Sequence, residues 1–468
     1  MQTRSSCTSI LIGKRASNDG SVMIGRNEDA KAAWPKHLVV RPAVAAAQTF
    51  KSKANSFTLA LPTDALQYTA TPEWTDQYGV FEEAGINTAG VAMSATESAY
   101  ANARVQGYDP FVTDGIIEEA MVTVVLPFIT SAQEGVRRLG AIVEEYGTGE
   151  ANGVLFADHD EAWYMEIATG HHWVAERIPD DAYAVVANQL AIQTVDFDSE
   201  AFMFSADIRE FAASHHLWQP STPFNFRQIF GTDSAFDRMY NTPRVWDGQR
   251  RLTPSQVADP EASDLPFYLQ PDRPLTVDDA FAVLSSHYQE TSFDPTSEIA
   301  TAPHRYRPIS LARTQEAHVL QLRPQLPQQI ADIHWVAMGV AAESQFVPFF
   351  AGAREFPDAY RQGGLPASLD SAYWQYKLAS VLIDAHFAKF AKALDAVQQS
   401  THAKLLASIA QADAAIAGLD AHALEGLATT ASAANAAIAH EAWQTFTMQL
   451  LVESTDRSPL NFNTDTNL

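Results

Sequence analysis

Apolar and polar residues alternate in two short runs close to the start of the chain. Residues 8–14 and 21–26 are rich in the β-branched and apolar side chains that strands favour. An Asn-Asp-Gly sequence at residues 18–20 lies between them, and these residue types tolerate the positive φ angles of tight turns. The pattern predicts a β-hairpin whose first strand begins at Cys7.

Further strand signals extend to residue 190. A turn at residues 84–90 leads into a strand-like segment at 91–98. Four more apolar runs follow at short intervals, separated by polar turns, at residues 153–158, 162–168, 172–178 and 183–190. This spacing is typical of an antiparallel meander, so we expect the four strands to pair in order.

Two other parts of the chain show apolar residues at helical spacing. Ser131 and Glu134 form a capping-box pattern ahead of an apolar stripe, and Gly147 is placed to end that helix. Beyond residue 370 the composition shifts toward alanine, and one helical stripe contains Tyr376, Ile383, Phe387, Phe390, Leu394 and Val397. We therefore predict a helix between residues 131 and 147 and a helical C-terminal part.

The order of these elements predicts an α+β protein with antiparallel sheets, because strands come first, helices next, then more strands and a final group of helices. Residues 252–274 contain several prolines and are predicted to form a long surface loop. A chain of 468 residues is long enough for two or three average domains, so its length leaves the number of domains open.

Charge and composition exclude several functions. Acidic residues outnumber basic ones by 56 to 31 without a Lys/Arg-rich segment, which argues against nucleic-acid and anionic-membrane partners. The longest apolar run, residues 121–129, is about half the length that spans a bilayer. No apolar signal segment precedes Cys7, and a single cysteine cannot form an internal disulfide. We therefore expect a cytoplasmic protein.

The only cysteine, Cys7, is a candidate nucleophile. A lone cysteine can equally be an inert buried thiol, because free cysteine packs like a small hydrophobic residue. Removal of residues 1–6 would give Cys7 a free α-amine with a pKa of about 7.7–8.0. Nucleophile and base would then belong to one residue, as in known enzymes with N-terminal nucleophiles. In the predicted hairpin Arg26 and Asp29 lie on the strand antiparallel to Cys7, where they could stabilise its thiolate and orient its amine.

These residues resemble a family. Residues 7–9 and 24–29 are similar to the start of the mature cysteine dipeptidases of the dipeptidase A type, and more distantly to bile salt hydrolases and penicillin V acylases. All of these are N-terminal nucleophile hydrolases. The similarity covers roughly residues 7–350 and continues in order through residues 85–98, 187–189, 240–246, 286–288, 317–318, 335–339 and 346–350.

The resemblance implies a four-layer αββα sandwich of two antiparallel sheets that hydrolyses amide bonds without a metal or other cofactor. It divides the chain into a propeptide at residues 1–6, a catalytic domain at 7–365 and a helical C-terminal extension at 366–468. Whether the propeptide removes itself stays open.

The resemblance also implies roles for individual residues. Cys7 matches the nucleophile, Arg26 and Asp29 match its supporting pair, Asn188 matches an oxyanion-hole donor and Arg244 matches a second active-site arginine. Thr96 and Glu97 stand where bile salt hydrolases place an asparagine, so we expect this pair to contact the substrate, with Glu97 facing its ammonium group.

The remaining motifs predict no further chemistry. The 14 histidines are scattered without metal-ligand spacing, and we expect His287 and His318 to be structural. The glycines at residues 147–153 lack the spacing of a dinucleotide-binding loop, and no G-x-S-x-G sequence occurs.

The sequence as a whole predicts a cysteine dipeptidase whose partners are dipeptide substrates and further copies of the same chain. Two alternatives stay open. The first is an acylase for N-acyl amides such as penicillin V or conjugated bile acids, and the second is a non-catalytic protein with a structural Cys7.

Overall fold

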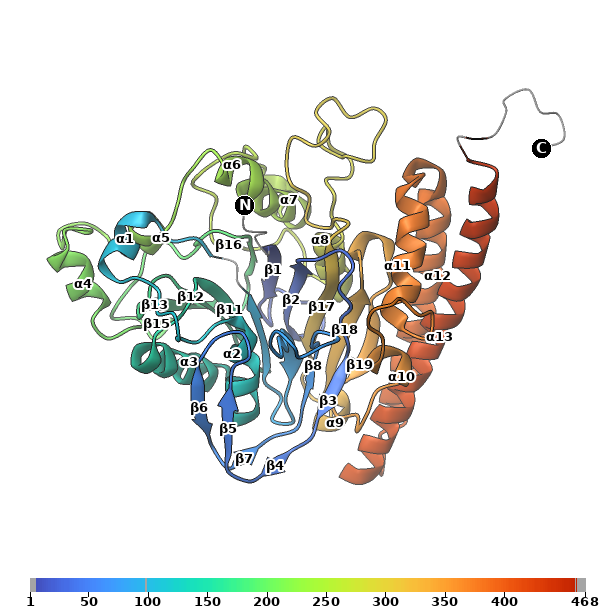
Figure 1. The fold of residues 1–468 in the computed structure, drawn as a ribbon, viewed down its shortest axis with the longest axis horizontal. Coiled ribbons are helices and arrows are strands. Elements are labelled where there is room, and N and C mark those ends of the chain that lie inside the picture. Colours follow the sequence, from blue (N-terminus) through green and yellow to red (C-terminus); the bar gives the residue numbers. More distant parts are fainter. Residues whose placement is uncertain (1–5, 97–98, 459, 461–468) are drawn as a thin grey trace.

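The computed structural model describes residues 6–96, 99–458 and 460, and two antiparallel sheets form its centre (Figure 1). The larger sheet has seven strands, in the spatial order β16 (Tyr268–Leu269), β14 (Tyr183–Val186), β1 (Ser6–Ile12), β2 (Val22–Asp29), β17 (Thr314–Leu322), β18 (Asp332–Met338) and β19 (Val347–Phe350). The second sheet has six strands, in the order β15 (Phe202–Phe204), β13 (Trp173–Ile178), β12 (Ala162–Ile167), β11 (Asn152–Ala157), β10 (Ala92–Thr96) and β9 (Ala84–Ile86).

The two sheets pack face to face and each is covered by helices on its other side. Alternate residues of β1, such as Leu11, point into an apolar layer that they share with Leu155 and Val174 of the second sheet. Ile10 and Ile12 point the opposite way, toward a core closed by α8 (Val277–Leu284), α11 (Ala372–Asp384), α12 (Phe387–Ala414) and α13 (Ala421–Thr455). Helices α2 (Glu118–Val125) and α3 (Ala132–Tyr146) cover the second sheet. These layers confirm the predicted αββα sandwich.

The structure contains further short strands and helices outside these layers. Three two-stranded sheets pair β3 (Val39–Arg41) with β8 (Tyr68–Ala70), β4 (Val44–Ala45) with β7 (Asp64–Ala65), and β5 (Gln48–Lys51) with β6 (Thr58–Leu61). The other helical segments are α1 (Ala103–Tyr108), η1 (Leu126–Phe128), α4 (Ile208–Ser214), α5 (Phe226–Phe230), α6 (Asp237–Tyr240), α7 (Thr242–Leu252), η2 (Pro254–Gln256), α9 (Gln328–Ala331), η3 (Ala341–Glu343) and α10 (Asp358–Arg361).

The predicted hairpin and the predicted helix are both present. Strands β1 and β2 are antiparallel neighbours, with Cys7 opposite Glu28. Helix α3 begins after Ser131, whose hydroxyl accepts a hydrogen bond from the backbone N–H of Glu134 at 3.2 Å. It ends at Gly147, which has a φ of 74° that glycine adopts without strain.

The predicted four-strand meander is wrong in its last strand. Strands β11, β12 and β13 pair in order, but β14 crosses to the larger sheet and pairs with β1. Both faces of β14 are buried, because Val185 faces the helices and Val186 faces the layer between the sheets. An alternating pattern says which residues share a face, but it does not say which sheet a strand joins.

The C-terminal helices pack directly on the larger sheet. Tyr376 of α11 and Phe390 of α12 share one buried core with Trp335 of β18 and Val347 of β19. The predicted stripe therefore runs over two helices, which are separated at residues 385–386. The domain boundary at residue 365 stays a prediction. Within the described residues, no helix is both long enough and apolar enough to cross a bilayer.

Candidate active site

Cys7 lies on a central strand of the larger sheet, and its side chain belongs to the layer between the two sheets. It has the same parity on β1 as Leu11, so both side chains leave the strand on the inner face. Only 3% of Cys7 is exposed. The sulfur accepts a hydrogen bond from Arg26 Nη1 at 3.1 Å, so the guanidinium from the neighbouring strand β2 touches the candidate nucleophile directly.

Arg26 is itself held by three further groups. Its Nε donates to Ser94 Oγ at 3.0 Å, its Nη2 donates to Glu83 Oε2 at 2.6 Å, and Glu118 Oε1 lies 3.7 Å from Nη1. Burial lowers the pKa of Arg26, but the negative charges of Cys7, Glu83 and Glu118 outweigh it and raise this pKa well above its usual value. A permanent cation in contact with a sulfur favours the thiolate, which is the reactive form of cysteine.

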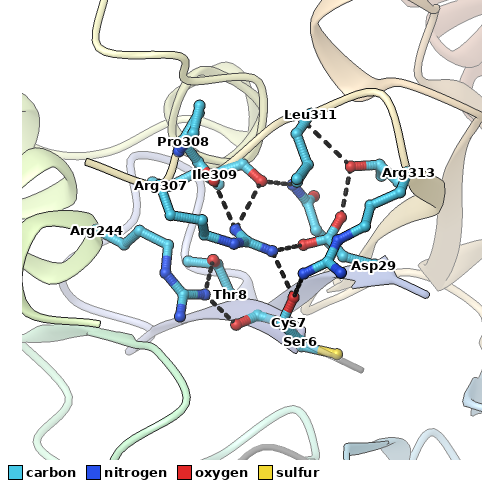
Figure 2. Close-up of polar contacts among 12 residues, drawn as sticks. Ser6, Cys7, Thr8, Asp29, Arg244, Arg307, Pro308, Ile309, Leu311 and Arg313 are labelled. Carbon is cyan, nitrogen blue, oxygen red and sulfur yellow. Dashed lines mark hydrogen bonds and ion pairs between the residues drawn. The ribbon is translucent and has the colours of Figure 1, made fainter. Parts of the chain in front are cut away.

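Asp29 lies at the end of β2, directly opposite Ser6 in the β1–β2 register. Its carboxylate accepts a hydrogen bond from Arg307 Nη2 (Figure 2) and another from the hydroxyl of Thr314. The carboxylate is fully buried. It therefore sits beside the peptide bond that joins Ser6 to Cys7, where an α-amine of Cys7 would appear after cleavage.

Arg244 of α7 ties the backbone of the nucleophile to Asn188. Its Nη1 donates to the carbonyl oxygen of Cys7 at 2.6 Å and to Thr8 Oγ1 at 2.9 Å, and its Nη2 donates to the side-chain oxygens of Asn188 at 2.6 Å and Asn241 at 2.7 Å. Burial, aided by repulsion from Arg307, lowers the pKa of Arg244 to about 9.

Asn188 follows strand β14, and its side-chain nitrogen is an unpaired hydrogen-bond donor in the described structure. Because Arg244 takes the amide oxygen, Nδ2 points elsewhere, and it has no hydrogen-bond partner among the residues that the structure describes. The side chain is fully buried. An unpaired buried donor costs about 1–3 kcal/mol, and an oxyanion hole needs a donor of this kind that is aimed at the reacting carbonyl.

The other predicted substrate contacts are not placed. Thr96 is the last residue of β10, and Glu97 lies outside the described residues.

Glu118 was not predicted from the sequence, although it lies close to the sulfur. Burial raises the pKa of Glu118 well above its usual value, and the charges of Glu83 and Cys7 add to this effect.

Glu118 belongs to a buried cluster of charged side chains around Arg26, the residue that contacts the sulfur. The cluster contains Arg26, Glu28, Lys36, Glu83, Glu118 and Glu316. Lys36 Nζ lies 2.9 Å from Glu28 Oε2, and burial raises the pKa of Glu316 to about 8. Charged residues usually face solvent, so apart from Arg26 the sequence pattern carried no signal for this cluster.

The two histidines expected to be structural are both hydrogen-bonded. His318 contacts Glu316 Oε1 at 2.8 Å and Ser94 Oγ at 3.0 Å, and burial lowers its pKa well below the usual value. His287 Nδ1 lies 3.0 Å from Asp294 Oδ1. In the described part of the chain, no group of three or more His, Cys, Asp or Glu side chains is arranged to hold a metal ion.

The structure thus combines a four-layer αββα sandwich with a buried cysteine near the start of a central strand. The chain belongs to peptidase family C69, whose model matches residues 6–400. A probable dipeptidase of Latilactobacillus sakei is 44% identical over 99% of this chain and 98% of its own length. Dipeptidase A of Lactobacillus helveticus is 37% identical over 85% of this chain and 86% of its own length.

The chain is also similar, at low sequence identity, to parts of solved structures. The penicillin V acylase of Agrobacterium tumefaciens aligns with 73% of this chain and 86% of its own, at 14% identity and a TM-score of 0.33. A mutant of the conjugated bile acid hydrolase from Clostridium perfringens aligns with 71% of this chain and 89% of its own, at 11% identity and a TM-score of 0.33.

Proposed function

We propose that this protein is a dipeptidase that uses the thiol of Cys7 to hydrolyse the peptide bond of dipeptides, once residues 1–6 have been removed. The observation that carries the proposal is the contact of 3.1 Å between Arg26 Nη1 and Cys7 Sγ in a member of a peptidase family. Relatives that align over nearly the whole chain and are named dipeptidases support the choice of substrate.

Maturation comes first in this mechanism. The Cys7 thiol attacks the carbonyl carbon of Ser6, the C–N bond to Cys7 breaks, and the nitrogen takes up the proton that the thiol loses and becomes a free amine. Water then hydrolyses the thioester, which releases the carboxylate of Ser6 and restores the thiol. An external protease would give the same products, so the proposal requires only that the mature chain begins at Cys7.

Substrate hydrolysis repeats this chemistry on a dipeptide. The Cys7 sulfur attacks the peptide carbonyl, and the α-amine, with a pKa of about 7.7–8.0 when unperturbed, accepts the thiol proton. Asn188 Nδ2 donates a hydrogen bond to the developing oxyanion. The leaving amino acid departs with the proton from the amine, and water, deprotonated by the same amine, hydrolyses the thioester.

Asp29 and Arg244 act as positioning residues in this scheme. The position of Asp29 opposite Ser6 lets its carboxylate accept a hydrogen bond from the new amine of Cys7. Arg244 fixes the amide of Asn188 through the oxygen and so leaves the nitrogen for the substrate.

Intact-mass measurement and activity assays together test the proposal. We expect wild-type protein that begins at Cys7, cleaves Leu-Ala faster than penicillin V or a glycine-conjugated bile acid, and keeps its activity in EDTA. Iodoacetamide should abolish this activity through modification of Cys7. Fully active protein that still carries residues 3–6 would contradict the mechanism. Faster cleavage of penicillin V or of the bile conjugate would contradict the dipeptide substrate and favour an acylase.

We also propose a cytoplasmic location and a homo-oligomeric state. A reducing compartment keeps the single thiol available, which supports the cytoplasm. Exposed apolar residues on the C-terminal helices support self-association, and they include Val381, Leu406, Met448, Leu451 and Val452. Light scattering during size-exclusion chromatography tests the second proposal, because a mass of one chain would contradict it.

A further inference from the structure

Two arginines and a tyrosine converge on the residue that precedes the nucleophile. Arg307 Nη2 donates to Ser6 Oγ at 2.8 Å, and Arg313 Nη2 donates to the same oxygen at 3.0 Å (Figure 2). Arg313 Nη2 also donates to the hydroxyl of Tyr240 at 2.8 Å. Ser6 is the last residue of the proposed propeptide, so its removal takes away an acceptor that both guanidiniums share.

Arg307 does not depend on Ser6 for its orientation. Its Nη1 donates to the carbonyl oxygens of Pro308 at 2.6 Å and Ile309 at 3.2 Å, and its Nη2 also pairs with Asp29. These contacts stay when Ser6 leaves, so the donor that faced Ser6 stays aimed at the vacated position.

Positive charge exceeds negative charge around this position. Asp29 pairs with Arg307, whereas Arg313 forms no ion pair with a carboxylate in the described part of the chain. Burial alone would raise the pKa of Tyr240, but the charge of Arg307, a hydrogen bond with Ser6 and the charges of Arg244 and Arg313 together lower it below the usual value. A site with such a charge excess favours an anion.

The position also matches the geometry of a leaving amino acid. During hydrolysis the nitrogen of the leaving residue must lie within hydrogen-bond reach of the Cys7 amine, from which it receives a proton. The carboxylate of that residue is separated from this nitrogen only by the α-carbon. Ser6 Oγ, which the two arginines contact now, is one covalent bond further from the Cys7 nitrogen than a carboxylate oxygen is from the leaving nitrogen, and that nitrogen lies one hydrogen bond from the Cys7 amine.

We propose that Arg307, Arg313 and Tyr240 bind the free C-terminal carboxylate of the substrate in the mature protein. This inference rests on the proposed dipeptidase function and deepens it, because it explains how the site would select peptides that end one residue after the cleaved bond. Guanidinium groups suit this role since they bind carboxylates through paired, charge-assisted hydrogen bonds. A longer peptide would place a neutral amide there and leave the two guanidiniums unpaired.

The test compares Leu-Ala with its C-terminal amide in the wild type and in Arg313→Gln. Loss of a charge-assisted hydrogen bond should lower kcat/KM for Leu-Ala by about 10- to 100-fold in the variant, with little change for the amide. Arg313→Lys should recover part of the preference for the acid because it keeps the charge. Arg305→Gln is the matched control, since Arg305 is an exposed arginine of the same segment that pairs with Glu261.

Each outcome separates the two proposals. Equal kcat/KM of the wild type for the acid and the amide, or equal losses for both substrates in Arg313→Gln at an unchanged melting temperature, would overturn the carboxylate site and leave the dipeptidase function intact. Failure of mature wild-type protein to cleave either substrate would overturn the proposed function, and the carboxylate site with it. If Arg313→Gln fails to fold, Arg313→Lys decides the question through the ratio of kcat/KM for Leu-Ala to kcat/KM for its amide. A ratio below that of the wild type supports the carboxylate site, and an unchanged ratio overturns it.

Discussion

At the residue scale, the open amide nitrogen of Asn188 makes a sharp prediction. Asn188→Ala removes the proposed oxyanion donor while Arg244 keeps its contacts with Cys7, Thr8 and Asn241. We expect kcat for Leu-Ala to fall by about 10²–10³-fold, with the N-terminus still processed and the melting temperature nearly unchanged. Steady-state kinetics, intact mass and thermal unfolding measure these three properties.

The control for Asn188 is Gln193→Ala, which removes another side-chain amide a few residues along the chain. The side-chain nitrogen of Gln193 donates instead to the carbonyl of Leu265. Its kcat should stay close to that of the wild type. Full activity of Asn188→Ala would remove Asn188 from the mechanism.

Arg26 carries the second prediction at this scale. Arg26→Gln should slow the reaction of Cys7 with iodoacetamide below about pH 8.5, because the thiolate loses its neighbouring cation. The variant also leaves Glu83 with only the more distant Lys36, at 3.7 Å, as a buried cationic partner, which should cost about 3–5 kcal/mol of unfolding free energy. Alkylation rates are therefore measured well below the melting temperature of the variant.

Arg15→Gln is the control for Arg26, because Arg15 follows the first strand of the same hairpin and its side chain is 68% exposed. It should alkylate as the wild type does. An unchanged alkylation rate in Arg26→Gln would show that the guanidinium does not govern the reactivity of the sulfur.

Some residues of the candidate active site could be predicted from the sequence and others could not. The hairpin register brings Arg26 and Asp29 to Cys7, and alternation along two short strands is enough to predict that. Asn188 and Arg244 reach the site from positions far along the chain, and only the resemblance to a family pointed to them. Arg307 and Arg313 lie in a segment without periodicity, so no pattern of apolar and polar residues could place them.

At the scale of elements, the C-terminal helices give the third prediction. Trp443 of α13 is fully buried in the core that covers β18 and β19, and its ring packs against Tyr376 at a centroid distance of 5.3 Å. Trp443→Ala should lower the free energy of unfolding by about 3–5 kcal/mol. Denaturant unfolding followed by circular dichroism measures the change.

Gln444→Ala is the matched control, because Gln444 lies beside Trp443 on the same helix and is exposed. Its effect should stay within about 0.5 kcal/mol. If residues 366–468 unfolded in a separate transition, with activity retained, the helices would form an independent unit.

The elements themselves were predictable where the signal was local. A capping serine and a terminal glycine defined α3 because the free energy of a helix end depends on neighbouring residues. The position of β14 depends on which of two buried layers accepts its side chains, and that choice is made by contacts with β1, far away in sequence.

At the scale of the whole molecule, buried carboxyl groups should make stability depend on pH. Burial raises the pKa values of Glu166, Glu176 and Glu316 to about 8, whereas the unfolded chain releases these protons near 4.5. Between these values the folded state binds more protons than the unfolded state, so stability should fall as the pH rises from about 5 to about 8. Thermal unfolding across this range measures the decline.

Glu176→Gln tests the origin of that decline, because it keeps the size of the side chain and removes one of these groups. The melting temperature should then fall less steeply with pH than it does in the wild type. Glu200→Gln, at an exposed position, should follow the wild-type curve. A wild-type melting temperature that rises over the same range would contradict the assignment.

The order of layers was predictable only through the family resemblance. Apolar alternation identified seven of the thirteen strands in the two sheets and none after residue 190. Two sheets with both faces covered give similar patterns, and pairing between β2 and β17 joins residues almost 300 positions apart. Local patterns contain no information about such partners.

The proposed cleavage before Cys7 also affects how the protein can be purified. If maturation removes everything before Cys7, an affinity tag fused to the N-terminus is cut off together with residues 1–6. Purification through that tag would then enrich the uncleaved, inactive precursor. Helix α13 ends at Thr455, far from β1 in Figure 1, so a tag placed after it stays with both forms and reports their ratio.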